Sequence, residues 1–149
     1  MCIRDRSWLI RHLKKAGVPD RDLIKIYIAI VRSVIEYAVP AYHSLLTSNQ
    51  ADELERLQRT ILKIIYGWNI SYTDALVKSG LSTLEERRAS LMEKFARKLE
   101  ANKRYEDWIP KHSDYSYPIR RKLIYQEERA RTEKMRNSPL FAIRKILNS

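Results

Sequence analysis

Hydrophobic residues along this chain recur at intervals of three and four, the spacing that places them on one face of an α-helix. Proline, glycine and short polar residues interrupt this pattern where helices begin and end. Glycine is scarce, and Leu, Ile, Lys, Arg, Glu and Ala dominate, a mixture that favours helices over strands and predicts an all-α fold. Five helices are expected before residue 104, at 8–16, 20–38, 48–66, 72–78 and 82–102, and one more at 139–147.

The predicted helix at 20–38 is apolar around most of its circumference. Its polar strip is narrow and consists of Asp22, Lys25, Ala29, Arg32 and Glu36. We therefore expect the other helices to pack on it. Asp20 is the expected N-cap residue. Pro40 is expected to end or kink the helix, because proline lacks the amide donor and clashes with the preceding turn.

Capping signals mark the starts of the later helices, because a short polar side chain can accept a hydrogen bond from the amide three residues on. They stand at Thr47, Ser48 and Gln50, at Ser71 with Asp74, at Ser82 with Glu85, and at Ser138 before Pro139. The third helix also carries two acid-first pairs, Asp52 with Arg56 and Glu55 with Arg59, which are typical of a solvent-facing surface.

The fifth predicted helix has one apolar stripe, and Arg88 falls on it. The stripe consists of Leu84, Leu91, Met92, Phe95 and Leu99. A guanidinium there must be satisfied inside the fold, so we expect Arg88 to pair with a buried carboxylate or with backbone carbonyls. Glu36 is a possible partner. This interpretation gives Arg88 a structural role.

The chain changes character beyond residue 104. Residues 105–117 read as a loop or arm, and the highly charged residues 119–136 read as either a solvated helix or a disordered basic segment. We therefore expect a helical, bundle-like domain at 7–104 and a basic, partly extended C-terminal extension at 105–149 that ends in a short helix. Residues 1–6 fit no helix pattern and are expected to be a non-native leader.

The net charge of +11 changes this picture, because it favours a polyanionic partner. Residues 101–149 hold 12 basic and 6 acidic residues, against 17 and 12 in residues 1–100, so the last third carries over half of the excess. We predict a nucleic-acid surface made of Arg11, Lys14, Lys15, Arg120, Arg121, Lys122, Arg129, Arg131, Lys134 and Arg136. Such contacts bind phosphates without reading sequence. The alternative is that these charges only keep the tail soluble.

Aromatic residues near the basic residues at 120–136, the tail cluster, add to this prediction, because unpaired bases stack on such side chains. They are Tyr105, Trp108, Tyr115, Tyr117 and Tyr125.

Catalytic motifs are missing from the sequence. It has no Asp-Asp pair, phosphate-binding glycine loop, nucleophile elbow or His-Glu-x-x-His motif, and His12, His43 and His112 are isolated. The single cysteine, Cys2, excludes an intrachain disulfide. No stretch reads as a membrane span or a signal peptide. We expect no catalytic activity, no metal site and no cofactor in this chain.

Several motifs resemble, in order, the region after the palm of reverse transcriptases of LINE-type (non-LTR, jockey-like) retrotransposons. They are LKKAGV (13–18), DLIKIYIAIVRSVIEYAVPAYHS (22–44), LERLQRTILKIIYG (54–67), GLSTLEERR (80–88) and RTEKMRNSPLFAIRKILNS (131–149). The resemblance covers residues 7–149 and implies a thumb, a helical bundle that holds the template-primer duplex, followed by a C-terminal extension.

The resemblance also implies roles for individual residues. Arg11, Lys14 and Lys15 would approach the duplex backbone, and the turn with Tyr37, Pro40 and His43 would be structural. The partners would be RNA or an RNA–DNA hybrid and the missing polymerase domains. Those domains would supply the metal carboxylates, bind Mg²⁺ and act in the nucleus, so the chain is interpreted as a non-catalytic fragment of an RNA-directed DNA polymerase.

Two alternatives stay open. One is a self-standing helical module that binds a protein, with the charged tail as a solubility element. The other is a cellular nucleic-acid-binding protein derived from such an element.

Overall fold

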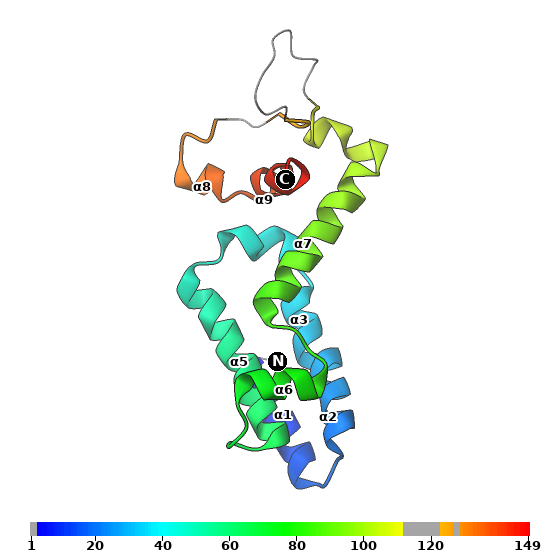
Figure 1. Cartoon of the computed structure of the whole chain (residues 1–149), viewed down its shortest axis with the longest axis vertical. Coiled ribbons are helices and arrows are strands. Elements are labelled where there is room, and N and C mark those ends of the chain that lie inside the picture. The colour runs from blue at the N-terminus through cyan, green and yellow to red at the C-terminus, as the bar shows by residue number, and fades with distance from the viewer. Residues whose placement is uncertain (1–2, 112–122, 127–128) are drawn as a thin grey trace. The chain divides into compact units, whose positions relative to one another are not determined.

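The computed structural model describes residues 3–111, 123–126 and 129–149. These residues form nine α-helices, one π-helix and two 3₁₀ helices, and they contain no strand (Figure 1). An isolated antiparallel bridge joins Lys111 to Tyr125. The predicted all-α fold is confirmed.

The chain divides into two compact units. Unit 1 comprises Met1–Ala38 and Thr47–Arg88, and unit 2 comprises Val39–Leu46 and Ala89–Ser149. Each unit has its own hydrophobic core. The division expected near residue 104, between a helical domain and a basic extension, stays a prediction.

Unit 1 begins with α1 (Ile3–Lys15) and α2 (Asp20–Ile26). The start of α1 corrects the expectation that residues 1–6 follow no helical pattern, since the helix begins at Ile3. The chemical reason is that arginine, at positions 4 and 6, is a good helix former. Pro19, rather than Asp20, occupies the N-cap position of α2.

The chain after α2 departs from the regular helix expected at 20–38. Residues Tyr27–Arg32 form a π-helix, η1, and the short α3 (Ser33–Glu36) follows. Apolar spacing does not reveal this change of hydrogen-bond register, because apolar side chains nearly surround the segment. Arg32, expected on the exposed polar strip, is only 6 % exposed.

The helix does end before Pro40, as expected. Proline then lies in the first turn of α4 (Val39–Tyr42), where its missing amide donor costs little. The 3₁₀ segment η2 (His43–Leu45) continues from α4, so the expected aromatic turn is largely helical.

The remaining helices that begin in unit 1 start at a predicted cap or one residue beyond it. In α5 (Ser48–Tyr66), Thr47 and Gln50 form a reciprocal capping box. Ser71 caps α6 (Tyr72–Ser79) and Gly80 ends it. The capping pair of α7 (Leu84–Glu100) is Thr83 with Glu86, one residue beyond the predicted pair of Ser82 with Glu85.

The core of unit 1 lies among α1, α2, η1 and α5. Its fully buried members include Leu23, Tyr27, Val31, Ile61 and Ile65. Helix α1 packs on both α2 and α5, and α6 crosses α5 (Figure 1). The helix at 20–38 therefore contributes one face to this core, while Ile28 and Val34 on its other side are exposed.

Unit 2 contains the later part of α7, then η3 (Lys103–Trp108), α8 (Glu133–Arg136) and α9 (Pro139–Leu147). The 3₁₀ helix η3 stands where a loop was expected. Ser138 caps α9 and proline occupies its first turn, as predicted. The core of unit 2 consists of Met92, Ala96, Leu99, Ile109, Tyr125 and Ile143.

Candidate functional site

The predicted cationic face of α1 is only partly available to a ligand. Arg11 and Lys15 are exposed. Lys14 forms an ion pair with Asp20, at 2.5 Å from Nζ to Oδ1. Because this pair bridges the end of α1 and the start of α2, Lys14 also serves the fold of unit 1.

The described part of the predicted tail cluster is exposed. Arg129, Arg131, Lys134 and Arg136 all present their side chains to solvent. Arg120, Arg121 and Lys122 lie outside the described residues, as do Tyr115 and Tyr117.

The predicted base-stacking residues separate into two groups. Trp108 is 55 % exposed and its ring lies 5.2 Å from that of Tyr105, between centroids. Tyr125 is only 2 % exposed, and its hydroxyl donates to Glu100 Oε1 at 2.6 Å. Burial, together with that carboxylate, raises the pKa of Tyr125 to about 12. Tyr125 is thus a core residue of unit 2, and the expectation that it stacks on bases was wrong.

The residues with predicted structural roles lie in different settings. Pro40 and His43 are half-buried, in α4 and η2. Tyr37 is 90 % exposed, so its ring is in water rather than in a core.

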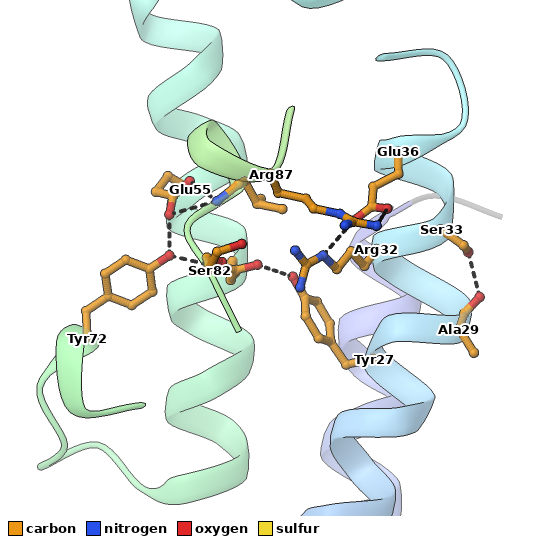
Figure 2. A network of polar contacts seen from close by, with 11 residues as sticks. Tyr27, Ala29, Arg32, Ser33, Glu36, Glu55, Tyr72, Ser82 and Arg87 are labelled. Atoms are coloured by element: carbon orange, nitrogen blue, oxygen red, sulfur yellow. Dashed lines mark hydrogen bonds and ion pairs between the residues drawn. The ribbon is translucent and has the colours of Figure 1, made fainter. Parts of the chain in front are cut away.

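Arg88 is buried, at 3 % exposure. The prediction that it could pair with Glu36 was wrong. The carboxylate of Glu36 instead accepts two hydrogen bonds from Arg87, at 3.0 and 2.9 Å, and one from Arg32 Nε at 2.6 Å (Figure 2). Successive helix positions point about 100° apart, so Arg87 and Arg88 cannot share one direction. Among the described residues, Arg88 Nε and Nη1 have no hydrogen-bond partner.

The Glu36 carboxylate is half-buried between the two guanidinium groups. Burial opposes its ionisation, but the hydrogen bonds from Arg87 and Arg32 outweigh that effect and hold the pKa of Glu36 below its ordinary value. The hydrogen bonds between Arg87 and Glu36 also raise the pKa of Arg87. Glu36 and Arg87 are therefore both charged at neutral pH.

A second polar network crosses the core of unit 1 at Gln58, which is fully buried. Its amide accepts from the hydroxyl of Tyr27 at 2.7 Å. It donates to the hydroxyl of Tyr72 and to the carbonyl of Ser82, both at 3.0 Å (Figure 2). Sequence analysis missed this residue, although Gln58 stands on the apolar face of α5 between Leu54 and Ile61.

Glu55 extends this network to the start of α7. Its carboxylate accepts from the Tyr72 hydroxyl and from the Leu84 amide, the latter at 3.1 Å. The predicted surface pair of Glu55 with Arg59 is therefore corrected, because Glu55 turns inward to satisfy a helix amide. The Arg59 guanidinium lies over the Tyr72 ring, 4.9 Å from its centroid.

A pocket of about 430 Å³ opens beside the Arg32, Glu36 and Arg87 cluster. Ser33 and Ser82 also line it. Sequence analysis did not identify this pocket, since it placed Arg32 on a polar strip and assigned no role to Arg87.

The described residues contain no group of three or more histidine, cysteine or acidic side chains placed to hold a metal ion. Within that part of the chain, no helix combines the length and apolar character needed to cross a membrane. No protein-family model, curated protein or solved structure matches the chain.

Proposed function

We propose that this chain binds RNA or an RNA–DNA hybrid without sequence specificity, as the thumb-like and C-terminal part of a LINE-type reverse transcriptase. Its contribution is to hold the template-primer duplex, and catalysis belongs to the polymerase domains that carry the metal carboxylates. The proposal rests on the order of sequence motifs described above and on the basic surface. It assigns no cofactor to this chain.

The observation that carries the binding proposal is the exposed basic cluster of Arg129, Arg131, Lys134 and Arg136. Each phosphate that a basic side chain neutralises releases counterions, which gives salt-sensitive affinity. The exposed ring of Trp108 supports the proposal, because it is open to stacking on an unpaired base.

The proposal is tested by fluorescence anisotropy with labelled RNA and labelled RNA–DNA hybrid across a salt series. We expect affinity to fall steeply with salt for the full chain. The triple variant Arg131→Gln, Lys134→Gln, Arg136→Gln should lower the salt slope by roughly two to three, as expected when two or three phosphate contacts are lost. Truncation at residue 111 is a poor test, because it removes Tyr125 and Ile143 from the core of unit 2.

A matched control removes the same charge from the exposed side of α7, with Lys94→Gln, Arg97→Gln and Lys98→Gln. We expect this variant to keep a slope near that of the wild type. Equal losses in both variants would contradict a tail-centred interface. No binding at low salt would overturn the proposal and favour the protein-interaction module.

A further inference from the structure

The pocket beside Glu36 in unit 1 contains an unbalanced charge. The ion pairs there join Arg32 and Arg87 to the same carboxylate. Two guanidinium groups with one carboxylate leave one net positive charge. Burying charge that is not fully compensated is costly, so this arrangement favours an anion that completes the balance.

The guanidinium of Arg32 has donors left over. An arginine offers five N–H groups, and the pair with Glu36 uses the one on Nε. The four on the terminal nitrogens have no acceptor among the described residues, although the residue is 6 % exposed. Arg32 lines the pocket, so these donors are available to a molecule that enters it.

Arg87 complements this arrangement from the other side of the carboxylate. Its Nε and Nη2 bind the two oxygens of Glu36, which fixes the plane of the guanidinium and leaves Nη1 outside that pair (Figure 2). Ser33 and Ser82 also line the pocket, and the Ser33 hydroxyl donates to the carbonyl of Ala29.

The backbone at Arg32 is also unusual, since this residue ends the π-helix η1. Short π-helical turns occur frequently at functional sites. Here the π-helix ends with a guanidinium that is buried against the pocket, where the sequence predicts a solvent-facing one.

We propose that this pocket binds a phosphate group through Arg32 and Arg87, with Glu36 orienting both guanidinium groups. Guanidinium forks match the geometry and charge of phosphate oxygens, whereas chloride offers no such set of acceptors. The site stands on unit 1 alone and does not depend on the basic tail or on nucleic-acid binding.

The experiment titrates inorganic phosphate into the full chain by calorimetry, with sodium chloride at matched ionic strength as the reference. We expect saturable phosphate binding to the wild type and a loss of roughly tenfold or more in Arg32→Gln. The control Arg97→Gln removes another arginine that pairs with a glutamate four residues away, Glu93, but that arginine is 71 % exposed. Its affinity should equal that of the wild type.

A second measurement covers the case in which Arg32→Gln does not fold. In wild-type protein carrying ¹⁵N-labelled arginine, phosphate should shift the side-chain resonances of Arg32 and Arg87 with one common midpoint. The proposal would be overturned if these resonances did not move, or if chloride shifted them as much as phosphate does. The cluster would then have a purely structural role. Unchanged phosphate affinity in folded Arg32→Gln would overturn it equally.

The source of the phosphate group is then identified by competition. Oligonucleotides of one sequence, with a 5′-phosphate or a 5′-hydroxyl, are compared as competitors of inorganic phosphate. Better competition by the phosphorylated strand assigns the site to a terminal phosphate, and equal competition assigns it to the phosphodiester backbone. If neither competes, the ligand is a small free phosphate compound.

Discussion

Arg87 donates two hydrogen bonds to the carboxylate of Glu36, although 51 positions separate the two residues in the chain. The contact joins the first turn of α7 to the end of α3 within unit 1. Arg32 shares the same carboxylate from one helical turn before it. Glu36 is therefore the residue on which both guanidinium groups depend for their position.

Replacing Glu36 with glutamine should destabilise the protein at neutral pH by about 1–3 kcal/mol, because the buried Arg32 and the half-buried Arg87 lose their counter-charge. The pKa of Glu36 is held below its ordinary value in the folded state, so its stabilisation is present above the unfolded pKa. It is lost as the pH falls through the lower folded value. Urea unfolding at pH 7 and near pH 3 should therefore show that the wild type is more stable than Glu36→Gln at pH 7 and that this difference shrinks in acid.

The exposed glutamate Glu93, replaced by glutamine, provides the control for that experiment. Its ion pair with Arg97 lies in solvent, where such pairs contribute little. If the difference in unfolding free energy between the wild type and Glu36→Gln stayed constant down to pH 3, the ionic explanation would be contradicted.

Gln58 should be costly to replace, because its amide serves three buried or half-buried partners. We expect Gln58→Leu to lose roughly 2–4 kcal/mol of unfolding free energy and Tyr27→Phe roughly 1–2 kcal/mol, since each leaves polar groups unsatisfied. The double variant should lose less than the sum of the two, because the Tyr27 hydroxyl is then absent as well. Strict additivity in chemical denaturation would show that the two side chains act independently.

Thr47→Ala should cost about 1 kcal/mol of stability, because its hydroxyl accepts from the Gln50 amide at the start of α5. The neighbouring substitution Ser48→Ala removes an exposed hydroxyl inside the helix and should be nearly neutral. Thermal unfolding of both variants compares the cap with its neighbour. Equal midpoints for the two would contradict the capping role.

Gly80→Ala should destabilise by about 1–2 kcal/mol through backbone conformation alone. The residue has a φ of 66°, in the left-handed region, and an added Cβ would meet no atom within 4 Å. Gly80→Asn should cost less, because asparagine tolerates this region better. A Gly80→Ala protein as stable as the wild type in urea would contradict this explanation.

The sequence predicts helix positions well where capping and glycine signals are local. Thr47, Ser71, Gly80 and Ser138 each act within one turn of their own helix, so the chain carries the whole signal. The capping pair of α7 was misplaced by one residue because Ser82 and Thr83 offer the same chemistry. The structure uses Thr83 for the cap, and the carbonyl of Ser82 binds Gln58.

Hydrogen-bond partners that lie far apart in the sequence were harder to predict. The sequence predicted that Arg88 pairs with a buried carboxylate or with backbone carbonyls, but Arg87 binds Glu36. The two arginines are neighbours that differ in direction around the helix. Likewise, Glu55 has an arginine at the favourable spacing of four, and yet the Leu84 amide, 29 residues away, takes its carboxylate. Which residues become partners depends on how the helices pack against one another. The spacing of residues along a single helix carries no information about that packing.

The π-helix at Tyr27–Arg32 decides where this segment can accommodate a change in length. Its hydrogen bonds span five residues rather than four, so it sets the angular phase of everything that follows up to Glu36. One residue of α-helix corresponds to a rotation of about 100°. Each turn of π-helix takes up about one residue more than an α-helical turn, so a single-residue deletion that restored regular α-helix there would leave Glu36 facing Arg87. The same deletion in the α-helical residues between Arg32 and Glu36 would turn Glu36 away from Arg87. A change of length is therefore tolerated inside the π-helix and not beside it.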